Sequence, residues 1–75
     1  MLNNDVLRSL RFMLNISDAK VAEIIGLADL QVSEANISAC LKKEDEDGFT
    51  PCSDELLAHF LDGLVIFRRG KDDSR

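Results

Sequence analysis

One short pattern recurs four times along this chain and constrains its fold more than any other feature. In each copy an apolar residue precedes Ser or Asn, and a second apolar residue follows five positions after the first. The polar side chain of such a pattern caps the first turn of a helix, and the two apolar residues pack against each other across the cap. The copies begin at Leu2, Ile16, Val32 and Cys52. The sequence therefore predicts four helices.

Apolar residues after these starts recur every three or four positions, which is the spacing of one helix face. Asn15 follows the first of these segments and Gly26 lies near the end of the second, and both residue types commonly end helices. We expect helices at residues 4–14, 18–27, 34–43 and 54–69. The fold class is then all-α, a compact bundle of four short helices.

A chain of 75 residues has room for one domain with a thin core, because domains of this size bury only about 60% of their unfolded surface. We assign residues 1–70 to a single helical domain and residues 71–75 to a polar tail or a truncated linker. Apolar residues cover so wide an arc of the fourth helix that three short neighbours leave part of it uncovered. We therefore expect self-association as a homodimer.

Candidate interface residues are those at the edge of this arc or outside the expected core: Phe12, Phe49, Val65 and Ile66. Isolated surface hydrophobes are ordinary, so an exposed Ile66 without a role is the open alternative. If Ile66 lies in the interface, replacing it with a charged residue should give monomers that keep their helicity, because burying a charge is costly.

Fourteen acidic and nine basic residues give a net charge of -5, which makes binding to nucleic acids or to membranes unlikely. Basic residues still form a candidate polar surface, made of Arg8, Arg11, Arg68, Arg69 and Lys71. The N-terminus lacks the basic and apolar regions of a secretory signal, and no apolar run is long enough to span a membrane. We expect a soluble protein of the cytoplasm.

The residue types needed for catalysis or metal binding are few. The acidic loop after the third helix places Asp45, Asp47 and Gly48 as in a calcium-binding EF-hand, but Lys43 occupies the position of the first oxygen ligand. The helix expected at residues 54–69 contains His59 but no serine or cysteine, and the two cysteines are more typical of thiols than of a disulfide. We therefore expect that the protein is not an enzyme and that it binds no metal or cofactor.

A weak helix-turn-helix pattern spans residues 18–43, with Ala22, Gly26 and Val32 at its small, glycine and apolar positions. Its second helix contains no Arg or Lys before Lys42, so the usual donors to phosphates and bases are missing. A nucleic-acid-binding regulator is therefore the alternative function.

Several segments together resemble a known family: residues 3–12, residues 41–49, Cys52 with Asp54, residues 60–64 and residues 69–71. In order and spacing they are similar to the first repeat of the bacterial YehS-like family, whose function is unknown. The resemblance implies a helical protein of the bacterial cytoplasm that usually carries a second such repeat, and it implies no activity, cofactor or catalytic residue. The leading hypothesis is a non-enzymatic module for protein interaction or self-association, with a second copy or a second repeat as its partner.

Overall fold

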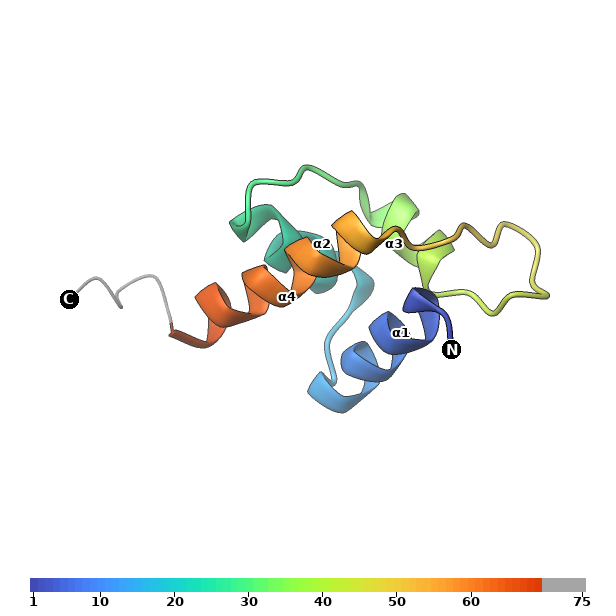
Figure 1. Ribbon diagram of the computed structural model, residues 1–75, viewed down its shortest axis with the longest axis horizontal. Coiled ribbons are helices and arrows are strands. Elements are labelled where there is room, and N and C mark those ends of the chain that lie inside the picture. The colour runs from blue at the N-terminus through green and yellow to red at the C-terminus, as the bar shows by residue number, and fades with distance from the viewer. Residues whose placement is uncertain (70–75) are drawn as a thin grey trace.

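Four helices make up the fold in the computed structural model, which describes residues 1–69 (Figure 1). They are α1 (Asn3–Leu14), α2 (Asp18–Leu27), α3 (Glu34–Cys40) and α4 (Asp54–Arg69). Within the described residues there is no strand. The predicted all-α class and the number of helices are confirmed.

Three of the four predicted helix starts have the expected cap. The hydroxyls of Ser17, Ser33 and Ser53 each accept a hydrogen bond from the backbone N–H three residues later, at 3.0 to 3.1 Å. These bonds satisfy donors that the first turn of a helix leaves without a partner inside the helix. The starts of α2, α3 and α4 are therefore fixed by local sequence.

The first helix begins at Asn3, one residue before the expected start, and its cap is not the expected one. Leu2 is the cap residue, and its backbone N–H donates to the Asp5 carboxylate at 3.0 Å. The Asn3 amide, expected as the cap, instead donates to the Cys52 carbonyl at 3.1 Å and to the Asp54 carboxylate at 2.6 Å. Asp5 thus supplies the local cap, and Asn3 bonds to a distant part of the chain.

The third helix ends three residues earlier than predicted, at Cys40. Two carbonyls of its last turn bond to other parts of the chain: that of Ala39 accepts from the Thr50 N–H at 3.2 Å, and that of Cys40 accepts from the Asn4 amide at 2.8 Å. These bonds attach the end of α3 to α1 and to the long connection before α4.

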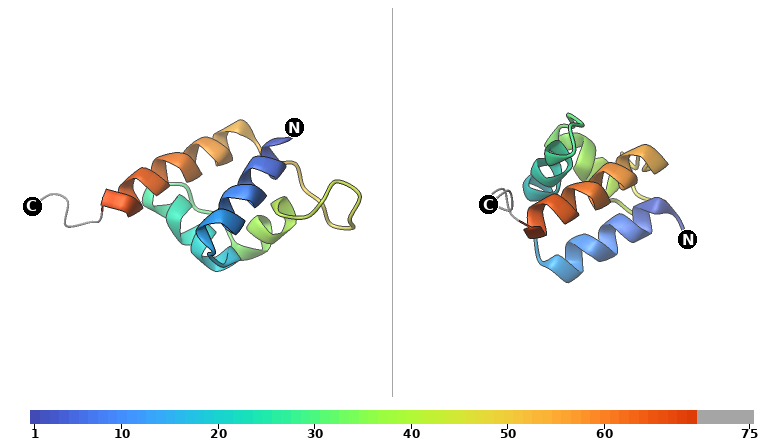
Figure 2. Two further views of the ribbon diagram at one scale, coloured as in Figure 1. Left: turned by 90° about the horizontal axis from the view of Figure 1, so that it is seen from below. Right: turned by 60° about the vertical axis from the view of Figure 1, so that its left-hand side comes forward.

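The core lies where α4 crosses α2, and its fully buried side chains are Leu7, Val21, Ile24, Ile25, Ile37 and Phe60. Gly63 of α4 meets α2 at Ile24, where a Cβ would overlap the Ile24 carbonyl oxygen and lie 2.8 Å from the carbonyl carbon. The two views of Figure 2 show α4 against α2, with α1 starting beside the beginning of α4. α2 packs against both α4 and α3, and one side of α4 is left uncovered.

Candidate functional site

Asn4, at the N-terminal end of α1, is the buried polar residue that organises one end of the molecule. Its Nδ2 donates to the carbonyls of Cys40 and Thr50, both at 2.8 Å, and its Oδ1 accepts from the Cys52 N–H at 3.0 Å. One amide therefore satisfies three backbone groups from two other segments. Nothing in the sequence pattern predicted this role for Asn4.

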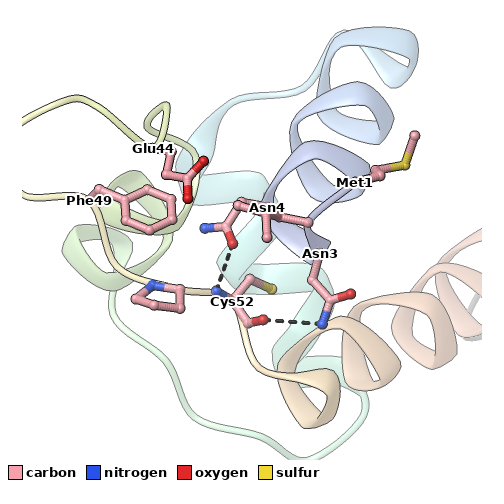
Figure 3. Close-up of a pocket in the computed structure, with 8 residues that line it drawn as sticks. Met1, Asn3, Asn4, Glu44, Phe49 and Cys52 are labelled. Atoms are coloured by element: carbon pink, nitrogen blue, oxygen red, sulfur yellow. Dashed lines mark hydrogen bonds between the residues drawn. The ribbon is translucent and has the colours of Figure 1, made fainter.

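A recess of about 360 Å³ opens beside this amide. Figure 3 shows Phe49 and Glu44 on one side of it, Met1 on the other, and Asn4 and Cys52 joined by a hydrogen bond at its floor. Both Nδ2 hydrogens and the oxygen of Asn4 already have backbone partners. A ligand entering here would have to compete with bonds that hold the connection in place, so the recess is better explained as part of a structural junction.

Cys40 and Cys52 are both buried thiols. Burial raises the pKa of both, and for Cys52 the nearby Cys40 and Asp54 contribute to a value of about 11. Because the thiolate is the reactive form, neither sulfur is prepared for nucleophilic chemistry at neutral pH. The two residues serve as small core side chains.

His59 lies on α4, and its Nδ1 is 2.8 Å from the carbonyl oxygen of Glu55, one turn earlier on the same helix. Within residues 1–69 no group of three or more His, Cys, Asp or Glu side chains has an arrangement that could hold a metal ion. In the same residues no helix has the length and apolarity needed to cross a membrane.

The outer flank of α4 is the side of the helix turned away from α2, and it consists of Asp54, Ala58, Leu61, Val65 and Arg68. All five residues are exposed, Leu61 to 44% and Val65 to 56%. They are spaced by four, three, four and three residues, which places them in one stripe along a helix. In Figure 1 no other element passes in front of this helix.

The four predicted interface residues do not form one patch. Val65 belongs to the outer flank of α4, whereas Ile66, 38% exposed, lies about 140° further round the helix from Leu61. Phe12 is 83% exposed near the end of α1, and Phe49 lines the recess at its beginning. Helical rise separates Phe12 from Asn4 by about 12 Å, so the two phenylalanines lie toward opposite ends of α1.

The predicted basic surface is also divided. Arg8 donates to the Lys42 carbonyl at 3.3 Å and pairs with Asp5, and Arg11 donates to the Ile16 carbonyl at 3.2 Å. Both arginines therefore bond to backbone carbonyls of neighbouring connections while their side chains stay partly exposed. Arg68 and Arg69 lie in the last turn of α4. Lys71 lies outside the described residues.

The helix-turn-helix-like segment consists of α2, a connection at residues 28–33 and the seven-residue α3. The solvent-exposed residues of α3 are Glu34, Ala35 and Asn36, and the helix contains no Arg or Lys. A reading helix normally offers basic side chains to phosphates, so this segment lacks the charge that DNA contacts need.

Comparison with known proteins gives a family and a relative without an assigned activity. The family model described as "Protein of unknown function (DUF1456)" matches residues 3–70. The chain is 42% identical over 74 residues to "Uncharacterized protein YehS" of Escherichia coli (strain K12), an alignment that covers 99% of this chain and 47% of that protein. The chain thus spans about half the length of the curated relative it matches. No solved structure matches significantly.

Proposed function

Because this chain belongs to the DUF1456 family, whose description assigns no activity, we propose from its surface that it is a non-enzymatic protein-interaction module. The outer flank of α4 is the interaction surface, and its partner is an amphipathic helix. One observation carries the proposal: three apolar side chains, those of Ala58, Leu61 and Val65, are exposed at the spacing with which paired helices contact each other.

Packing around the stripe supports this role. Leu57 and Leu64 lie beside it, half-buried, and pack against the core, so the apolar surface continues inward from the exposed residues. Gly63 fixes the other side of α4 against Ile24, which holds the stripe rigidly outward. A partner helix would meet a preformed surface, which lowers the entropic cost of binding.

The reactive groups support a role without chemistry. Both thiols are buried with raised pKa, and the His59 ring contacts a backbone carbonyl of its own helix. Free thiols are typical of proteins in the reducing cytoplasm, so the proposal includes a cytoplasmic location.

Site-specific photo-crosslinking in the cells that naturally produce the protein would test the interaction. A photoreactive residue at Val65 should give a protein adduct whose attachment site maps to an apolar helix face, and a second change, Leu61→Glu, should abolish it. The control carries the photoreactive residue at Glu55, which is exposed on another side of α4. Equal adducts at both positions, or none at Val65, would contradict the proposal.

A DNA-binding measurement on the purified protein distinguishes the alternative function. Affinity for duplex DNA that falls steeply with salt would favour a nucleic-acid-binding regulator, because phosphate contacts release counterions.

A further inference from the structure

We propose that the partner of the outer flank of α4 is the same flank of a second copy, packed antiparallel with the two-fold axis at Leu61. The inference rests on the proposed function and names the partner and the register. In a two-fold dimer the same patch meets itself, so every contact must be complementary to its own symmetric copy. The outer flank of α4 meets that condition in both charge and side-chain size.

Charge is the first argument. Asp54 precedes Leu61 by seven residues and Arg68 follows it by seven, and all three lie on the same stripe. Each charge is therefore about 10 Å along the helix from Leu61, in opposite directions. Antiparallel pairing about Leu61 brings Asp54 of each copy opposite Arg68 of the other. Parallel pairing would instead place like charges together at both ends.

The Asp54 carboxylate keeps its internal bond in this arrangement. Its Oδ1 accepts from the Asn3 amide at 2.6 Å, and a carboxylate has a second oxygen for the guanidinium of the other copy. Since Asn3 also binds the Cys52 carbonyl, the carboxylate is held at the start of α4 before a partner arrives.

Side-chain size is the second argument. Leu61 meets its own copy at the axis, and Ala58 on one copy lies next to Val65 on the other, offset by one residue or about 1.5 Å, because the two residues stand three and four positions from Leu61. Opposing a small residue with a larger one fills each layer without overlap. Ile66 takes no part, so this register separates it from Val65.

Disulfide formation reads out the register directly. Leu61→Cys should form a dimer crosslinked by oxidised glutathione, since residues at the two-fold axis are close enough for a disulfide. Ala58→Cys and Val65→Cys should each crosslink poorly alone and well when mixed. Wild-type protein is the control for the buried native thiols. Efficient self-crosslinking at all three positions would indicate parallel helices and overturn the proposal.

Sedimentation equilibrium with charge-reversed variants tests the end contacts. Asp54→Lys and Arg68→Glu, each alone, should dimerise about tenfold more weakly at low salt, because attraction becomes repulsion at both ends. An equimolar mixture should recover the affinity of the wild type, since each mixed pair is complementary again. Circular dichroism checks that both variants are folded.

Two outcomes would overturn the inference. One is a wild-type protein that stays monomeric up to about 1 mM, a concentration at which even a weak pairing would be populated. The other is a mixture of charge variants that associates no better than either alone. If Val65 still crosslinks a different protein in cells, the proposed function stands and only the second copy is excluded.

Discussion

The contact between α2 and α4 and the junction at the beginning of α1 hold the molecule together in different ways. At the first, Gly63 lets two helix backbones approach until no side chain fits between them. At the second, Asn4 uses one amide to bond the end of α3 and the connection before α4. The α2 and α4 contact depends on the missing side chain of Gly63, and the junction depends on three hydrogen bonds made by the two polar atoms of one amide.

This difference indicates how each region should respond to change. A close backbone contact cannot relax without separating the helices, so one added carbon affects the whole core. A hydrogen-bonded junction fails when its buried backbone groups lose their partners, but water entering from the adjoining recess can take over part of that role. Substitutions at the α2 and α4 contact should therefore have the larger effects.

Gly63→Ala should have the largest effect, lowering the free energy of unfolding by about 3 kcal/mol or more. The added methyl group would overlap the Ile24 carbonyl oxygen, a backbone atom that cannot rotate away. Urea titration measures the loss. Gly26→Ala is the matched control, because no atom lies within 4 Å of a Cβ there, and it should stabilise the protein by about 0.5 to 1 kcal/mol. Equal effects of the two substitutions would contradict the close-contact interpretation.

Asn4→Ala should come next, at about 2 to 3 kcal/mol, because it leaves buried backbone groups without a partner. Its control is Asn3→Ala, whose two bonds are nearer the surface and which should cost about 1 kcal/mol or less. Thermal or urea unfolding would compare them. If the Asn3 variant lost more stability than the Asn4 variant, the buried amide would not be the centre of the junction.

Local signals explain why the sequence predicted the helices and missed the junction. The hydroxyls of Ser17, Ser33 and Ser53 bond within three residues, so a short pattern contains all that is needed. The partners of Asn4 lie 36 to 48 residues away, and the early end of α3 at Cys40 follows from the same distant bonds. A single sequence contains no measure of such distances.

The exposed surface of α4 was also only partly predictable, because it depends on both a local pattern and a distant contact. Apolar periodicity predicted a wide apolar arc on the fourth helix with Val65 at its edge. The position at which α2 crosses α4 decides which part of that arc is covered. Gly63 determines that crossing, and a glycine inside a strongly apolar helix was the available signal, since it lowers helix stability unless packing requires it. Recognising it would have placed α2 on the Gly63 side and left Leu61 and Val65 outside.

Ser53→Ala should have a smaller effect than Asn4→Ala, lowering the free energy of unfolding by about 1 kcal/mol. The Ser53 hydroxyl accepts from the Leu56 N–H at 3.0 Å and caps α4, the helix that packs against α2. The control is Ser9→Ala on the exposed side of α1, where alanine should be neutral or slightly stabilising. A denaturant titration in which both variants match the wild type would show that the cap contributes nothing.

Asp5→Asn should have the smallest effect, and it should depend on pH. A hydrogen bond from the Leu2 N–H and the adjacent Arg8 guanidinium lower the pKa of the Asp5 carboxyl below its ordinary value of 3.8. A carboxyl whose pKa is lower in the folded state contributes stability above its unfolded pKa and loses that contribution as the pH falls through its folded pKa. The wild type should therefore be slightly more stable than the variant at pH 6, and the stabilities of the two proteins should converge below about pH 4.

Urea midpoints across this pH range measure the convergence for Asp5→Asn, with Asp47→Asn in the exposed loop as a control. A difference that stays constant down to pH 2.5 would mean that the charge of Asp5 does not stabilise the start of α1, and that the junction is held by Asn4 and its neutral bonds.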